Sequence, residues 1–244
     1  MDIRQLASRA GMTLLASLVL AMPVAAEEAK SLSLYGAGMI QDLPAEGALT
    51  QAMAQLVEQY GVFVGFGTSR APELRPDLEL TRADLWQWLS GVADATMMRA
   101  QSLNPVQLDH LPLQRAPLCQ GSGWLTPQES KSLSGVDKSA VWAGALMNLA
   151  NRYSAAVVPA DRKANPATPV TVSQAQACLA SFAPDIRLTG APSAPVRRGP
   201  FLIALAKALS AQDQQISDMA EEAEQERDAE RRARKYPDSA PGRR

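Results

Sequence analysis

The sequence predicts an all-α protein, in which two helix–loop–helix repeats precede a C-terminal helix that is first amphipathic and then charged. Two observations predict this class. Apolar residues recur at helical spacing in five segments of the chain. Four of these segments form two pairs in the same order, which is the pattern of an internal repeat.

The first helices of the two repeats carry the same apolar stripe. In each, the apolar residues occupy positions i, i+3, i+4, i+7, i+8 and i+11, which form one face of a helix. The two stripes lie 93 residues apart, and each ends in a tyrosine. The stripes are Leu49, Ala52, Met53, Leu56, Val57 and Tyr60, and Trp142, Ala145, Leu146, Leu149, Ala150 and Tyr153.

The second helices of the repeats begin with the same kind of cap. Thr81 is expected at the N-cap of the first, with Asp84 three residues on. Thr171 and Gln174 hold these places in the second, and both pairs fit a capping box. A quartet at i, i+3, i+4 and i+7 follows each cap and is expected in the core: Leu85, Trp88, Leu89 and Val92, then Ala175, Cys178, Leu179 and Phe182.

These repeats divide the chain into unit 1 at 27–93 and unit 2, a degenerate copy, at 133–184. Residues 94–132 are rich in proline, glycine and polar side chains and are expected to form a connector. Residues 185–200 are interpreted as a linker, and 201–244 as the C-terminal helix with a disordered charged tail. That helix carries a heptad-like seam, suited to packing on the domain or on a second copy: Leu202, Leu205, Leu209, Ile216, Met219 and Ala223, with Gln212 in its one polar gap.

Residues 1–26 have the features of a signal peptide. Arg4 and Arg9 precede an apolar stretch, and residues 24–26 are small, as cleavage sites require. The apolar stretch is shorter than the roughly 20 residues of a membrane span, although an uncleaved anchor is the alternative. We therefore expect an exported protein of the periplasm or cell envelope, with no transmembrane span after signal cleavage.

Cys119 and Cys178 are the two cysteines of the chain. An oxidising compartment permits a disulfide between them. In the chain-entropy model, closing a loop of that length stabilises the fold by roughly 4 kcal/mol. Two inert thiols are the alternative, and the disulfide is the prediction.

Composition argues against several classes of function. The net charge of −1 gives the whole chain no general affinity for nucleic acid or for an anionic membrane. His110 is the only histidine, which excludes a site with two histidine ligands, and no recognisable nucleophile accompanies it. We therefore expect no catalytic residue, no metal and no cofactor, and we interpret the protein as a non-enzyme. A wall-modifying enzyme with paired carboxylates is a weaker alternative.

The motifs of unit 1 occur in a recognisable order: Asp42-Leu43-Pro44, the helix from Leu49 to Tyr60, Gly61-Val62, Gly65, Pro76 and Thr81-Arg82-Ala83-Asp84. Unit 2 keeps part of this order: Gly135-Val136-Asp137, Trp142-Ala143, Tyr153, Pro166 and Thr171. The chain in this respect resembles the S-layer homology domain, especially the form near the N-termini of cyanobacterial outer-membrane porins. The resemblance implies an α-helical module that binds peptidoglycan-linked, often acidic, polymers noncovalently.

Members of that family often carry three copies that assemble a spindle with glycan grooves between the units, whereas two are identified here. The resemblance implies that Arg82 helps to bind the acidic glycan. Thr81 and Asp84 belong to the same motif and are candidate glycan contacts with it. For these two residues, however, helix capping is the simpler interpretation, because unit 2 keeps the equivalent pair.

Arg82 and Trp86 have no counterparts in unit 2, which has Val172 and Gln176 at these places. They lie at i and i+4 on one flank of the predicted helix. A guanidinium beside an indole suits an acidic sugar, through charge-assisted hydrogen bonds and stacking. In the alternative, Trp86 packs against the neighbouring unit with Arg82 over its face as a cation–π pair.

The sequence therefore predicts an envelope protein that binds a peptidoglycan-linked acidic glycan through its repeats. The alternative is a periplasmic scaffolding protein that binds another envelope protein through its helical units and its C-terminal helix. In that case, the seam at 202–223 would also serve self-association.

Overall fold

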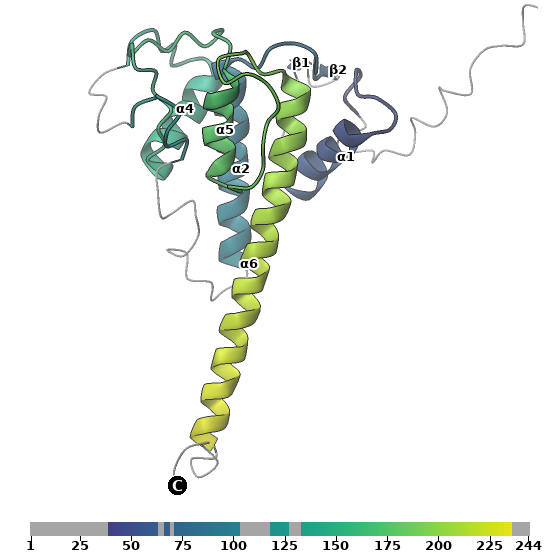
Figure 1. Ribbon diagram of the computed structural model, residues 1–244, viewed down its shortest axis with the longest axis vertical. Coiled ribbons are helices and arrows are strands. Elements are labelled where there is room, and N and C mark those ends of the chain that lie inside the picture. Colours follow the sequence, from purple (N-terminus) through teal and green to yellow (C-terminus); the bar gives the residue numbers. More distant parts are fainter. Residues whose placement is uncertain (1–38, 63–65, 69–70, 103–117, 127–132, 236–244) are drawn as a thin grey trace, which may run out of the picture.

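The computed structural model describes residues 39–62, 66–68, 71–102, 118–126 and 133–235. The all-α class is confirmed: helices gather in a head, and one long helix continues far beyond it (Figure 1). The predicted signal peptide, His110 and most of the predicted connector lie outside the described residues.

Unit 1 contains two helical elements separated by a short hairpin. Helix α1 (Ala48–Ala54) continues into the π-helical turn η4 (Gln55–Gln59), and α2 spans Arg82–Ser102. Strands β1 (Phe66–Thr68) and β2 (Ala71–Glu73) pair antiparallel between them, an element that the periodicity did not predict. Helix α2 also runs past residue 93, into the segment expected to be a connector.

Unit 2 repeats this order of helices. Helix α4 spans Val141–Tyr153 and α5 spans Val172–Ala180, in agreement with the expected pair. Helix α4 packs along α2, so the first helix of unit 2 covers the second helix of unit 1. Every residue of the two predicted core quartets is at most 2% exposed, which places both quartets in one continuous core.

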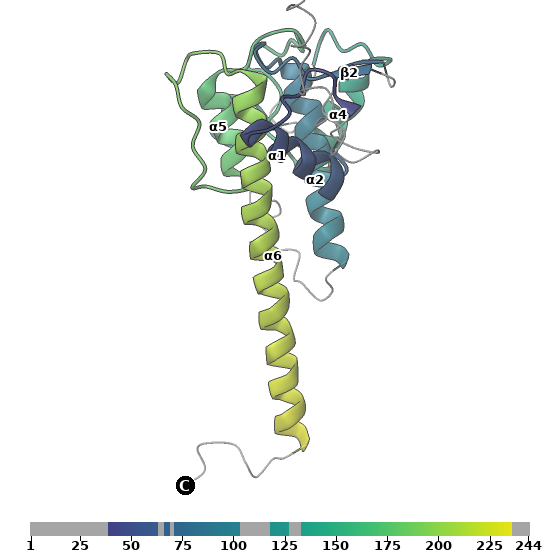
Figure 2. The same ribbon diagram turned by 90° about the vertical axis from the view of Figure 1, so that its right-hand side faces the viewer.

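Helix α6 (Arg198–Lys235) packs against α1 and α2 and then leaves the head as a single projecting arm (Figures 1 and 2). Its seam is buried within the chain as far as Ile216, and Met219 is only partly covered. From residue 224 to 235 every position of the helix is exposed. Packing on α1 and α2 therefore buries most of the face that was considered for self-association.

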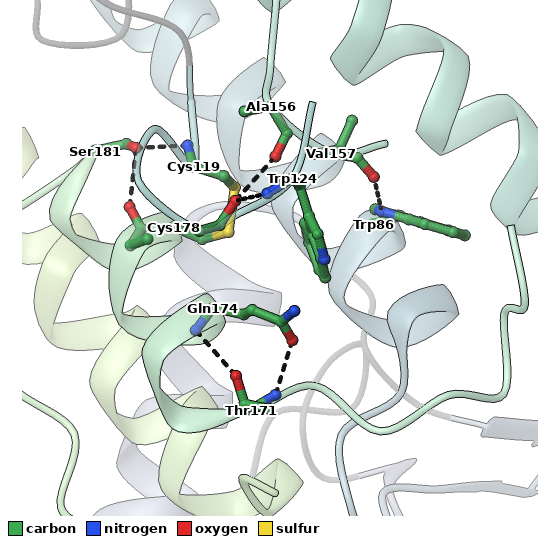
Figure 3. Close-up of a disulfide and its surroundings, with 11 residues drawn as sticks. Trp86, Cys119, Trp124, Ala156, Val157, Thr171, Gln174, Cys178 and Ser181 are labelled. Carbon is green, nitrogen blue, oxygen red and sulfur yellow. Dashed lines mark hydrogen bonds between the residues drawn. A yellow bond between two sulfur atoms is a disulfide. The ribbon is translucent and has the colours of Figure 1, made fainter. Parts of the chain in front are cut away.

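The predicted disulfide between Cys119 and Cys178 is confirmed (Figure 3). It joins the segment 118–126 to α5, and the Cys119 N–H donates to the Ser181 hydroxyl at 2.9 Å. Both cysteines are at most 1% exposed. The bond therefore fastens a non-helical segment directly to the core.

Over the ranges that the structure describes, none of the helices combines the length and the apolar character needed to cross a membrane.

Candidate functional site

Three similar turns lead into α2, α5 and α6. We call residues 75–81, 165–171 and 191–197 the ring segments. In each, the N–H of the fourth residue donates to the carbonyl of the first at 3.0–3.1 Å, and a proline stands second. In each, the sixth residue is an apolar side chain at most 4% exposed: Leu80, Val170 and Val196.

These three apolar residues are joined in a closed cycle of backbone hydrogen bonds, the backbone ring. The cycle runs from the Leu80 N–H to the Val196 carbonyl at 2.8 Å, from Val196 to Val170 at 3.0 Å, and from Val170 back to Leu80 at 2.8 Å. Residues 191–198 thus form part of a third unit, which consists of its turn and α6. This finding differs from the linker expected over 185–200 and from the two units identified in the sequence.

Each ring segment also provides carbonyl acceptors for the first N–H groups of a neighbouring helix. The first N–H groups of a helix have no partner within it. At α2, the Arg82 N–H donates to the Thr168 carbonyl and the Ala83 N–H to the Pro166 carbonyl, both at 3.0 Å. Turns 191–194 and 75–78 serve α5 and α6 in the same way, at 2.9–3.0 Å. The result is a pseudo-threefold head in which every unit holds the next.

The third unit is incomplete within the described residues. Helix α4 covers α2, and α1 covers α6. No corresponding first helix belongs to the turn at 191–197. The face of α5 that carries Cys178 is instead reached by the disulfide-linked segment 118–126.

Thr81 and Asp84 form the expected capping box. The Asp84 N–H donates to Thr81 Oγ1 at 3.3 Å, and Asp84 Oδ2 accepts from the Thr81 N–H at 3.0 Å. The same Oδ2 also accepts from Nε of Arg198 at 3.0 Å and forms an ion pair with a terminal nitrogen of its guanidinium at 3.0 Å. Asp84 therefore caps a helix and neutralises a buried guanidinium. Because Asp84 is 3% exposed, it offers no surface to a ligand.

Trp86 is placed differently from the predicted glycan contact. Its side chain is fully buried, and its Nε1 donates to the Val157 carbonyl at 3.2 Å (Figure 3). Its ring centroid lies 5.5 Å from that of Trp142, on the first helix of unit 2. The prediction of a ligand-facing Trp86 is therefore wrong, and packing between units explains the residue. Among the described side chains its aromatic partner is Trp142, and the expected cation–π pair with Arg82 does not form.

The Arg82 side chain is partly buried between units 1 and 2. One terminal nitrogen donates to the carbonyls of Lys163 and Ala164, both at 3.3 Å. Its Nε is buried and has no hydrogen-bond partner in the described part of the chain. Burial lowers the pKa of Arg82, and the charge of Asp161 opposes this effect. A shallow, open depression lies beside the turn that receives its backbone N–H, lined by Asn165, Pro166, Ala167 and Thr168.

A polar cluster between α2 and α4 was not predicted. Asp94 accepts from the Asn148 amide at 2.8 Å, from the Tyr153 hydroxyl at 2.7 Å and from Arg152 at 2.8 Å. Burial, then the hydrogen bond to Asp94, raises the pKa of Tyr153. The side chains of this polar cluster form hydrogen bonds across the two helices, so the cluster joins the two units. A polar residue on the flank of each helix was its only signal in the sequence.

No group of three or more histidine, cysteine, aspartate or glutamate side chains is placed to hold a metal ion within the described ranges. Comparison with family models, with curated proteins and with solved structures finds no match for this chain.

Proposed function

We propose that this is an exported, non-enzymatic protein of the cell envelope, whose head binds an acidic glycan linked to peptidoglycan. The observation that carries the proposal is the cyclic, pseudo-threefold arrangement of the ring segments 75–81, 165–171 and 191–197. The family that the motifs resemble places its glycan grooves between three such units. A third unit, missed in the sequence, removes one objection to the resemblance.

Arg82 supplies the chemistry of the proposed site. It stands where unit 1 meets unit 2, and its side chain is partly exposed. A guanidinium binds a carboxylate through two parallel charge-assisted hydrogen bonds, so it favours an acidic sugar over a neutral one. With Trp86 buried, the site relies on charge and hydrogen bonding rather than on stacking.

The disulfide supports the proposed location. Disulfides persist in oxidising compartments such as the bacterial periplasm and are rare in the cytosol. The Cys119–Cys178 bond fits a chain that folds after export.

Binding to purified sacculi, before and after removal of their acidic polymers, tests the proposal. The wild-type protein should sediment with intact sacculi and be lost to the supernatant once the acidic polymers are removed. Arg82→Ala should lower recovery at least tenfold, because the guanidinium is the proposed anchor. Arg231→Ala, on the exposed arm, is the matched control and should bind as the wild type. Equal recovery of Arg82→Ala and wild type, with both folded by circular dichroism, would rule out the glycan site.

A second candidate is a scaffolding role in which another envelope protein binds the arm. The observation that favours it is the exposed helix from 224 to 235, which continues beyond the last fully buried residue, Ile216. Deleting residues 221–244 separates the two candidates, since glycan binding by the head should survive that deletion and a protein contact on the arm should not.

A further inference from the structure

Arg82 and Arg198 occupy equivalent places in the head. Each is the first residue of its helix, and the N–H of each donates to the carbonyl of the fourth residue of the neighbouring ring segment. The Arg198 side chain meets Asp84, the acceptor of the capping box in unit 1. Gln174 is the acceptor of the capping box in unit 2 and therefore the pseudo-threefold counterpart of Asp84.

The two arginines differ in what that counterpart can offer. The Gln174 amide oxygen accepts from the Thr171 N–H at 3.0 Å, as Asp84 does from Thr81, but its other end is an NH2 group and carries no charge (Figure 3). In Arg198, the Nε–H group donates a hydrogen bond to Asp84 at 3.0 Å. The same atom of Arg82 is the buried donor without a partner among the described residues.

We propose that Gln174 is the specificity-determining residue of the head, because it brings no carboxylate to Nε of Arg82 and so leaves this donor to be paired by the carboxylate of a bound acidic sugar. Asp84 fills the same edge of Arg198 and closes that interface. At the third interface the arginine position holds Val172, which brings no charge. The head thus binds one acidic group, at the interface between units 1 and 2. This inference rests on the proposed function and adds the residue that selects an acidic ligand and a stoichiometry of one.

The Asp84–Arg198 pair shows how the ligand is held. One carboxylate oxygen lies 3.0 Å from Nε and 3.0 Å from a terminal nitrogen of the guanidinium. An external carboxylate in this place would accept a hydrogen bond from Nε of Arg82. Without such an acceptor, this buried donor costs free energy. Because Nε is buried in the unliganded head, binding of the carboxylate must expose it.

Gln174→Glu tests the inference with an isosteric change. Glutamate is a standard capping-box residue, so the start of α5 is retained. The new carboxylate should accept from the Thr171 N–H and from Arg82, as Asp84 does in its own interface. We expect binding of D-glucuronate, followed by NMR titration of the arginine Nε–H signals, to weaken at least tenfold. D-glucose should produce no shift in either protein. Gln225→Glu, on the exposed arm, adds the same charge and should bind as the wild type.

Two further results separate this inference from the proposed function. If wild type binds sacculi and Gln174→Glu binds glucuronate and sacculi equally well, the inference is overturned and the proposed function stands. A different result would keep the inference and overturn the proposed function. In it, the wild type does not bind sacculi, but glucuronate shifts the Arg82 signal of the wild type and not that of Gln174→Glu. A titration that fits two equivalent sites per chain would overturn the stoichiometry of one.

Discussion

The second helices of units 1 and 2 are covered in different ways. Helix α2 lies under a full helix, α4, whose Trp142 meets Trp86 and whose polar residues surround Asp94. Helix α5 is reached by the short segment 118–126, attached at Cys178. The first cover is a whole helix. The second is a short segment held by a disulfide, by backbone hydrogen bonds and by the buried side chains of Leu118 and Trp124.

This difference shows what a missing helix requires. A short non-helical segment has fewer side chains to bury than a helix, and here Leu118 and Trp124 provide most of the buried apolar surface. A disulfide acts on the unfolded state instead, by limiting its conformational freedom. The bond therefore adds to the packing and the hydrogen bonds that hold this cover. The two faces should respond differently to mutation and to reduction.

Truncating Trp86 should have the largest effect, since it breaks the helix-covered face at its centre. Trp86→Ala removes a fully buried indole and should lower the free energy of unfolding by about 3–5 kcal/mol. Trp86→Phe retains most of the buried area and loses the hydrogen bond to Val157, so it should cost about 1–2 kcal/mol. Urea unfolding followed by circular dichroism measures both. A loss below about 1 kcal/mol for the alanine variant would contradict packing between units as the role of this residue.

Removing the disulfide should have the next largest effect. Cys119→Ser with Cys178→Ser should lower the free energy of unfolding by about 2–4 kcal/mol. Reducing the wild-type protein should give a similar loss, and reduction should not change the stability of the double variant. Chemical denaturation with and without dithiothreitol makes the comparison. If reduction destabilises wild type and double variant equally, the covalent bond is not what holds the α5 cover.

Much of the fold was predictable because local patterns carry it. Periodicity identified α1, α2, α4 and α5, and both core quartets are buried as predicted. The third unit was not predicted, because it lacks the sequence features by which the other two were identified. Arg197 and Pro200 stand where Thr81 and Asp84 form a cap, and no first helix precedes the turn. What remains is a proline four residues before a buried valine, a pattern too short to recognise without its hydrogen bonds.

The candidate site was predictable in part, and for a physical reason. Capping is a local interaction, so Thr81 and Asp84 were interpreted correctly as a cap. The burial of Trp86 depends on Trp142 and Val157, which lie more than 50 residues away in the sequence. Helical spacing shows which flank a residue occupies, but not which element covers that flank.

Tyr153 gives the smallest expected effect and sharpens the comparison, because it isolates one polar contact of the helix-covered face. Tyr153→Phe removes the hydrogen bond to Asp94 and should lower the free energy of unfolding by about 1–2 kcal/mol near neutral pH. The folded pKa of Tyr153 is raised, so its protonated form is favoured in the folded state. The stability linked to this shift is complete below the unfolded pKa of about 10 and falls as pH rises above it, because only the unfolded tyrosine ionises there.

The pH dependence separates Tyr153 from the rest of the head. Wild type should lose stability with rising pH above about 10, and Tyr153→Phe should lose it less steeply. Tyr60 also has a raised pKa, through burial and the charge of Asp213, so Tyr60→Phe is the control and the two effects should add. Urea unfolding at intervals between about pH 9 and pH 11 measures the slopes. Identical slopes for wild type and Tyr153→Phe would show that the hydroxyl is not held by Asp94 in solution.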